Sequence, residues 1–267
     1  MRLGISGALE HGSVLEWAKK QSELGCKSIV FPISCNESTD LIDEYVKAAR
    51  ENDLLIAEVG IWRNALYGDE VEKNLDYCIN QLRLADYIGA RCCVNVAGAI
   101  GSRWDGGYKE NFSKETYEKI VKMVRYIIDT ANVKNTYFTL EPMPWLIPTG
   151  PDEYLRLLED VDRDRFAVHL DGINMINSAQ RYFGMEEFID ECVEKLGKYI
   201  RSCHIKDIHL QDEYTLMLRE CAPGVGEFPL KYYMNKLGSL DEDMPIILEH
   251  LNSDEDYYKY FDYIKKL

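Results

Sequence analysis

The sequence lacks the features that define several common classes of protein. None of its eight cysteines forms a Cys-X-X-Cys pair. No apolar run approaches the roughly 18 residues that a membrane-spanning helix needs. No secretory signal is visible at Met1–Ile5, so we expect reduced, mostly structural thiols in a cytoplasmic protein.

Positive charge is also scarce, because the net charge is −15 at pH 7. Proteins that bind nucleic acid or anionic membrane surfaces usually present a basic face to phosphate groups. The charge therefore argues against a nucleic-acid partner and, more weakly, against a membrane partner.

A Gly-rich phosphate-binding turn is missing after the first predicted strand. The turn reads Gly4-Ile-Ser-Gly-Ala-Leu-Glu-His11, which is not a dinucleotide fingerprint. This disfavours a doubly wound open sheet, the main alternative among folds that alternate strands and helices.

Strands and helices alternate eight times along the chain, without a linker or a low-complexity segment. The predicted strands are Arg2–Ser6, Lys27–Phe31, Leu54–Gly60, Arg91–Ala97, Tyr137–Glu141, Phe166–Asp171, Tyr199–His204 and Pro245–Glu249. The predicted helices are Val14–Leu24, Thr39–Glu51, Glu70–Ile88, Pro229–Leu237 and Asp254–Lys266, with others opening near Ser113, Thr149–Glu153 and Met185. Eight such units in one chain predict a single-domain (β/α)8 barrel, an α/β TIM barrel, over residues 1–267.

Four successive predicted strands end on a side chain that can bind a metal. They supply Glu141, Asp171, His204 and Glu249 in turn. Each alone has an ordinary interpretation, as a turn former, a helix cap or a buried core histidine. Because the carboxyl ends of the strands form the active-site face of such a barrel, four in succession predict a metal centre with oxygen-rich ligands.

Residues near this rim are weaker candidates. Side chains alternate along a strand, so His169 should face inward with Asp171, and Lys206 with His204. By the same parity His250 is a poorer ligand than Glu249, and His209 lies past its strand. Residues that could contact a substrate are Trp62, Asn95, Trp104, Asn174 and Glu220, although Trp62 and Trp104 could equally pack loops.

The ligand set resembles that of the xylose-isomerase-like superfamily of sugar isomerases and epimerases. His204-Ile-Lys-Asp207 and Pro223-Gly-Val-Gly226 look like two further signatures of the superfamily, and the resemblance covers essentially the whole chain. It implies one divalent ion held by Glu141, Asp171, His204 and Glu249. Manganese is the first choice, with Mg²⁺ and Co²⁺ as alternatives, because the set combines carboxylates with an imidazole.

A second resemblance is to the α subunits of C-glycoside deglycosidases. Similar segments are Asn95–Gly98, Glu141–Trp145, Asn174–Ser178 and Arg181–Phe183. Those enzymes pair the barrel with a small β-sandwich subunit, so this resemblance implies a hetero-oligomer, whereas an isomerase would be a homo-oligomer. Asn174 stands where a His tends to follow the Asp in ketose epimerases, which weighs against that particular activity.

The resemblance implies proton abstraction next to a sugar carbonyl. Glu141 and Glu249 would form the acid/base pair, and Lys206 and His169 would polarise a hydroxyl or carbonyl group. Two alternatives remain: a DNA-repair endonuclease, which five histidines and the acidic charge disfavour, and a non-catalytic sugar-binding barrel. Within the superfamily, isomerase or epimerase chemistry is our first hypothesis, and cleavage of the C–C bond of a 3-oxo-C-glucoside is the second.

Overall fold

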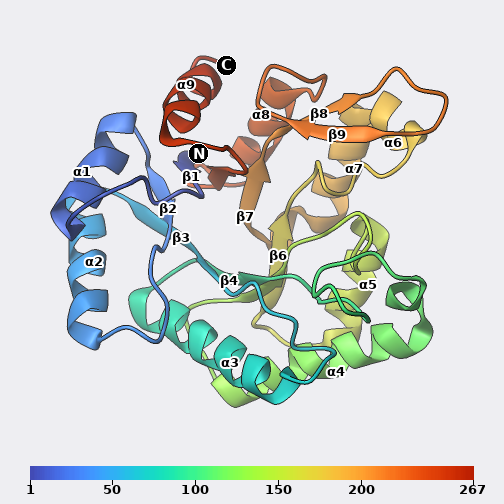
Figure 1. Cartoon of the computed structure of the whole chain (residues 1–267), viewed down its shortest axis with the longest axis horizontal. Coiled ribbons are helices and arrows are strands. Elements are labelled where there is room, and N and C mark those ends of the chain that lie inside the picture. Colours follow the sequence, from blue (N-terminus) through green and yellow to red (C-terminus); the bar gives the residue numbers. More distant parts are fainter.

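Eight parallel strands close into a barrel in the computed structural model, which describes residues 1–267 (Figure 1). The barrel strands are β1 (Arg2–Ile5), β2 (Ser28–Val30), β3 (Leu55–Gly60), β4 (Cys92–Asn95), β5 (Phe138–Leu140), β6 (Phe166–Leu170), β7 (Ile200–Ile205) and β10 (Pro245–Leu248). The neighbours follow the order β1-β10-β7-β6-β5-β4-β3-β2, and β1 pairs with both β10 and β2. This closure confirms the TIM barrel and rules out the open sheet.

Helices surround the barrel and, except for a short unpredicted helix at Ala179–Phe183, begin close to where the sequence predicts them (Figure 1). They are α1 (Val14–Leu24), α2 (Thr39–Glu51), α3 (Val71–Ile88), α4 (Lys114–Ala131), α5 (Pro151–Val161), α6 (Ala179–Phe183), α7 (Met185–Leu196), α8 (Leu230–Leu240) and α9 (Asp254–Ile264), with short 3-10 turns at Lys109–Phe112 and Gly197–Tyr199. None of these helices has both the length and the hydropathy that crossing a membrane requires.

Local sequence signals explain the helix boundaries. The side chains of Ser13, Ser38 and Ser113 each accept a hydrogen bond from a backbone N–H in the first turn that follows. Gly25 and Gly89 follow α1 and α3 with φ values of 94° and 75°. Because L-residues with a side chain seldom adopt this conformation, glycine favours the chain leaving the helix there.

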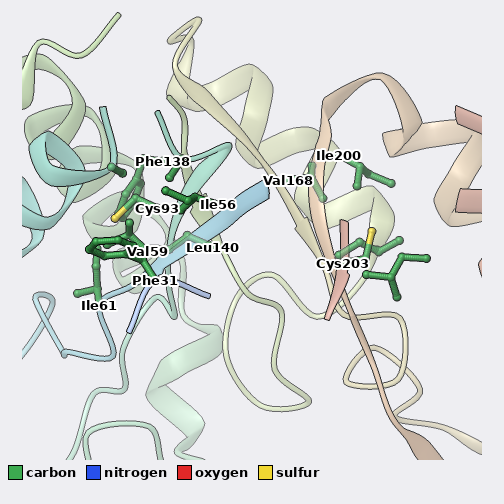
Figure 2. Close-up of a cluster of buried hydrophobic side chains, with 14 of the residues drawn as sticks. Phe31, Ile56, Val59, Ile61, Cys93, Phe138, Leu140, Val168, Ile200 and Cys203 are labelled. Carbon is green, nitrogen blue, oxygen red and sulfur yellow. The ribbon is translucent and has the colours of Figure 1, made fainter. Parts of the chain in front are cut away.

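The barrel strands carry a continuous apolar core. Figure 2 shows part of it, with Phe138, Leu140 and Val168 fully buried on strands that also lead to the site. Runs of β-branched and aromatic residues on both faces are expected of a parallel sheet covered by helices. This packing fixes the strand ends, and therefore the side chains that follow them.

Two short strands were not predicted, β8 (Asp207–Leu210) and β9 (Leu218–Cys221), which pair antiparallel as a hairpin. The hairpin stands outside the barrel (Figure 1). Glu220 therefore lies on a strand of this hairpin rather than in a loop.

The two signature segments of this region meet at Asp207. Its carboxylate accepts hydrogen bonds from the backbone N–H groups of Gly224 at 2.8 Å, Gly226 at 3.1 Å and Phe228 at 2.9 Å. A side chain on Gly226 would bring its Cβ within 2.3 Å of the carbonyl oxygen of Ile208. This close approach explains why residue 226 is a glycine. The three hydrogen bonds to Asp207 anchor the chain just after β7.

Tyr154 of α5 joins the two strands that lead to Glu141 and Asp171. Its buried hydroxyl lies 2.7 Å from the carbonyl oxygen of Leu140 and 3.1 Å from that of Ala167, and it accepts from Leu140 N at 3.2 Å. Tyr154→Phe should therefore lower the free energy of unfolding by about 1–3 kcal/mol in urea, because buried backbone groups lose their partner. Tyr126→Phe, on an exposed tyrosine, should change it by less than about 0.5 kcal/mol. Equal effects of the two changes would contradict this role of Tyr154.

Candidate active site and metal centre

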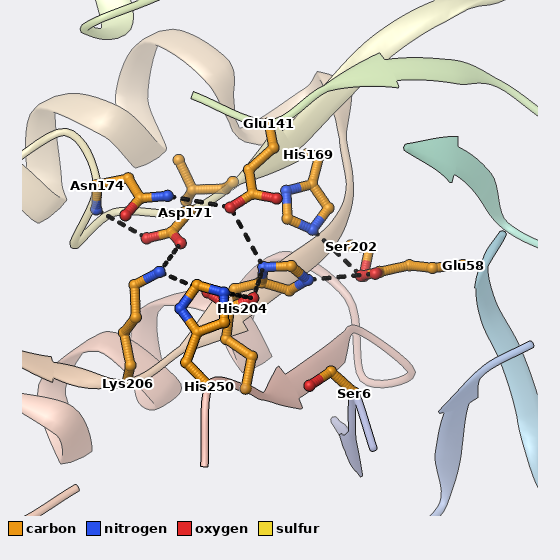
Figure 3. Close-up of polar contacts among 12 residues, drawn as sticks. Ser6, Glu58, Glu141, His169, Asp171, Asn174, Ser202, His204, Lys206 and His250 are labelled. Carbon is orange, nitrogen blue, oxygen red and sulfur yellow. Dashed lines mark hydrogen bonds and ion pairs between the residues drawn. The ribbon is translucent and has the colours of Figure 1, made fainter. Parts of the chain in front are cut away.

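The carboxyl ends of β5, β6, β7 and β10 bring four buried side chains together. One ligand atom from each of Glu141, Asp171, His204 and Glu249 lies within 4.8 Å of the others (Figure 3). Glu141, Asp171 and Glu249 follow directly after their strands, and His204 is the penultimate residue of β7. The barrel thus unites residues that are more than 100 positions apart in sequence, as the pattern of strand ends predicts.

His204 is oriented as a metal ligand would be. Its Nδ1 atom lies 2.8 Å from Glu249 Oε2 and 3.6 Å from Glu141 Oε1, yet it makes no well-aligned hydrogen bond. A buried nitrogen left in this state is unusual, because buried polar atoms are normally paired. Three carboxylates and one imidazole around a common point are also a donor set that suits Mn²⁺ or Mg²⁺. The residues therefore fit a divalent ion.

Lys206 provides positive charge inside this cluster. Its Nζ atom lies 2.7 Å from Asp171 Oδ2 and donates to Glu249 Oε1 at 2.5 Å. Burial acts to lower the pKa of Lys206, but Asp171 and Glu249 outweigh it and raise the pKa well above its usual value. Burial likewise acts to raise the pKa of Glu249, while His204 and Lys206 hold that pKa well below its usual value. The carboxylates of Glu141, Asp171 and Glu249 thus outnumber the ammonium of Lys206, while burial raises the pKa of Asp171. Burial acts to lower the pKa of His204, but the neighbouring carboxylates outweigh it and raise that pKa well above its usual value.

Glu58 of β3 was not identified from the sequence, yet it contacts the centre through His204. Its buried carboxylate accepts hydrogen bonds from Nε2 of His204 and Nε2 of His169, both at 3.2 Å, and from the hydroxyl of Ser202 (Figure 3). Burial acts to raise the pKa of Glu58, but the two imidazoles hold the pKa well below its usual value. A carboxylate that binds the far nitrogen of a ligand histidine fixes the ring and leaves its other nitrogen for the metal. The signal was present as one acidic residue within the apolar segment Leu55–Gly60.

The expected inward orientation of His169 and Lys206 agrees with their burial. Neither residue lines the cavity above the centre. His169 turns its Nε2 to Glu58 and packs edge-on against His204, with the ring centroids 4.1 Å apart. Because both side chains are engaged with other residues of the site, we assign them to its charge and orientation rather than to polarising a substrate group.

Asn174 and Glu220 lie at the edge of the centre, where the sequence placed them. Asn174 donates from Nδ2 to Glu141 Oε1 at 3.0 Å, and its backbone N–H donates to Asp171 Oδ1 at 2.8 Å. Glu220 Oε1 pairs with His250 Nδ1 at 2.9 Å. Asn174 thus orients two of the four predicted ligands, and His250 contacts Glu220 at the edge of the site.

A cavity of about 380 Å³ opens above the centre. Its lining residues are Ser6, Val30, Glu58, Trp62, Val96, Trp104, Asp105, Glu141, Met143, His204, Glu249 and His250. Trp62 and Trp104 were expected near the rim and do line this cavity. His250, which parity made a poorer ligand candidate than Glu249, also lines it, and its backbone has a φ of 58° directly after Glu249.

Asn95 is placed differently from the expectation that it would contact substrate. It is fully buried, and its amide accepts from Arg63 N at 3.1 Å and donates to Arg63 O at 2.9 Å. Through these two hydrogen bonds, the Asn95 side chain holds the turn that follows β3. Asn95 therefore positions the backbone next to Trp62, and both polar atoms of its amide are engaged there.

Comparisons with known proteins agree with this architecture. A family model described as a xylose isomerase-like TIM barrel matches residues 18–267. Among solved structures, D-psicose 3-epimerase with D-tagatose from Clostridium cellulolyticum H10 has a TM-score of 0.72 at 15% identity, covering 100% of this chain and 97% of that chain. An E. coli 3-keto-D-glucoside 4-epimerase has a TM-score of 0.71 at 14% identity over 100% of both chains. A xylose isomerase-like protein from Mycobacterium smegmatis in complex with magnesium has a TM-score of 0.70 at 19% identity, covering 96% and 89%. No curated protein matches the sequence.

Proposed function

Because the chain belongs to the xylose isomerase-like TIM-barrel family, we propose that it is a metal-dependent enzyme that removes a proton next to a sugar carbonyl. The observation that carries the proposal is the pair of carboxylates at the ends of β5 and β10, Glu141 and Glu249. Both line the cavity, and both approach Nδ1 of His204. A substrate in the cavity would therefore meet two candidate acid/base groups at once.

Glu141, Asp171, His204 and Glu249 would hold the divalent ion, with Mn²⁺ the first choice and Mg²⁺ or Co²⁺ as alternatives. A bound divalent ion would act as a Lewis acid toward the oxygen atoms of the substrate carbonyl and the adjacent hydroxyl group. The magnesium named for the related M. smegmatis structure supports a divalent ion of this kind.

The two glutamates divide the proton transfers. One takes the proton from the carbon next to the carbonyl, and the electron pair of that C–H bond moves into a new C=C bond while the carbonyl oxygen gains charge. The other returns a proton to one of the two carbons. Return to the opposite face of the same carbon gives an epimer. Return to the former carbonyl carbon gives the aldose or ketose isomer, provided that the hydroxyl proton of the adjacent carbon passes to the former carbonyl oxygen and leaves the new carbonyl there. Asn174 orients Glu141, and Lys206 stabilises the ionised form of Glu249.

A second candidate is C–C bond cleavage of a 3-oxo-C-glucoside, and a specific feature favours it. A cleft of about 590 Å³ adjoins the cavity at Met143 and His250 and is rich in apolar side chains, among them Trp145, Leu216 and Leu218. This lining suits a flat aromatic aglycone. Removal of the C2 proton would let a C1=C2 bond form while the C1–aryl bond breaks, and the aryl carbon would take up a proton. In this case the chain would be the α subunit of a hetero-oligomer with a small β-sandwich subunit; as an isomerase it would be a homo-oligomer.

A paired assay on Mn²⁺-loaded protein tests both candidates. One arm follows solvent deuterium into a panel of ketoses, aldoses and 3-oxo-glucosides, and the other follows aglycone release from a 3-oxo-C-glucoside. We expect deuterium incorporation that disappears after treatment with a chelator and returns with Mn²⁺. Aglycone release, with or without an added β subunit, would select the lyase instead. Failure of both arms with metal bound would contradict the proposal.

A further inference from the structure

Two tryptophans join the inner cavity to a second, larger cleft. Trp62 and Trp104 line the cavity of about 380 Å³ above the predicted ligands, and they also line an outer cleft of about 960 Å³. Both side chains are partly exposed, at 36% and 39%. The inner cavity is at the small end of ligand sites, so a larger molecule held there would extend past these two indoles.

Trp62 is held in this position at the expense of backbone strain. Its φ is 55°, a left-handed conformation that is rare for a bulky residue. The indole folds back over Gly60, where a Cβ atom would lie 2.4 Å from Nε1 of Trp62. Asn95 holds the adjacent Arg63 backbone from within the barrel. Strain that is supported in this way is typical of residues placed for function.

Trp104 lies on a loop that is held in place by side-chain hydrogen bonds. Buried Asn111 donates to the carbonyl oxygens of Gly106 and Trp145 and accepts from Ile100 N. Asn64 then connects this loop to the one that carries Trp62, because its Nδ2 atom donates to Ala99 O at 2.8 Å. The two indoles therefore form a preformed edge that the two cavities share.

The outer cleft has the chemistry of a sugar-binding surface. Besides the two indoles, it is lined by the half-exposed ring of Tyr67 and by the polar side chains of Asp69, Glu70 and Asn74. The Asp69 carboxylate is exposed and makes no hydrogen bond or ion pair within the chain. Aromatic faces pack against the C–H faces of a pyranose, while carboxylates and amides bind its hydroxyl groups. The cleft at Trp145 and Leu216 is more apolar and suits hydroxylated rings less well.

We propose that the outer cleft binds a second sugar ring, so that the preferred substrate is a carbonyl-bearing disaccharide rather than a monosaccharide. The reacting ring would occupy the inner cavity, and the second ring would lie past Trp62 and Trp104 toward Tyr67. This inference rests on the proposed function, because it assumes that the reacting carbonyl lies over the metal centre.

The test compares 3-oxo-cellobiose with 3-oxo-glucose in the wild type and in Tyr67→Ala. Tyr67 lines the outer cleft only, and its loop is anchored by backbone N–H groups that bind Asn64 Oδ1, so the variant should fold. We expect kcat/KM for deuterium exchange into the disaccharide to fall about 10-fold, mainly through KM, while the value for the monosaccharide is unchanged. The matched control is Tyr126→Ala, which removes an exposed tyrosine of α4 that lines neither cleft and should leave both substrates unaffected.

Equal losses on both substrates, no loss on the disaccharide, or an equal disaccharide loss in Tyr126→Ala would each overturn the proposal. If the wild type exchanges neither sugar, the proposed function has failed, and calorimetric titration with 3-oxo-cellobiose then decides the subsite separately. Weaker binding to Tyr67→Ala than to the wild type would support the outer cleft, and equal or undetectable binding to both would refute it.

Discussion

Replacing Glu141 by glutamine should lower kcat for deuterium exchange by about 10²- to 10⁴-fold, the usual contribution of general acid–base catalysis. The change keeps the size of the side chain but removes its ability to carry a proton. Asn174 donates to Glu141 Oε1 at 3.0 Å, and the amide oxygen of glutamine can still accept this bond. We therefore expect the thermal unfolding midpoint to change little. The measurement is the rate of solvent deuterium incorporation at saturating substrate and Mn²⁺.

The same variant separates an enzyme from a barrel that only binds sugar. An enzyme should lose turnover and retain substrate binding in a calorimetric titration. Glu187→Gln, an exposed glutamate in the first turn of α7, is the matched control and should behave as the wild type. Normal turnover by Glu141→Gln would show that the acid/base assignment is wrong.

Glu58→Gln should weaken Mn²⁺ binding by about 10- to 100-fold, although Glu58 is not among the four predicted ligands. The carboxylate accepts from Nε2 of both His204 and His169 at 3.2 Å, which directs Nδ1 of His204 toward the centre. A glutamine amide cannot accept from both rings in this way, because one of its two polar atoms is a donor. The orientation and the tautomer of His204 would then no longer be fixed. Calorimetric titration of metal-free protein with Mn²⁺ measures the effect directly.

Ser202→Ala is the control for this second prediction. It removes the hydroxyl that donates to Glu58 but keeps the carboxylate and both imidazole contacts. Its effect on Mn²⁺ affinity should therefore be much smaller, and both variants should be compared in their unfolding midpoints without metal. Unchanged Mn²⁺ affinity in Glu58→Gln would mean that the carboxylate has no part in preparing the ligand. Equal losses in the two variants would indicate a general loss of packing instead.

The four predicted ligands could be found from the sequence because the pattern that marks them is local, and the closure of a parallel barrel then brings them together. Glu141, Asp171, His204 and Glu249 each stand at or near the carboxyl end of a strand, and strand closure brings all such ends to one face. No knowledge of which strands are neighbours was needed. The capping serines and the glycines that end helices were readable for the same reason, since each acts within a few residues of its own position.

The contacts that cross the barrel could not be read in this way. Glu58 lies on β3 and meets Ser202 and His204 of β7, a strand that is not its neighbour in the sheet. Nothing around Glu58 in the sequence indicates this pairing. The partners of Asn95 could not be identified for a related reason: a buried amide must find partners, but the sequence does not say whether these are a substrate or a nearby turn.

The sequence by itself therefore determined the barrel, its helices and the four side chains that converge on the centre, because periodicity and strand ends are local properties. Only the tertiary structure decided which of the remaining polar residues face the cavity. It turned His169 toward Glu58, closed Asn95 onto the Arg63 backbone and set Trp62 and Trp104 between two clefts. The physical reason is that a buried polar group is satisfied by whatever the fold brings within reach, and the fold brings together residues far apart in sequence.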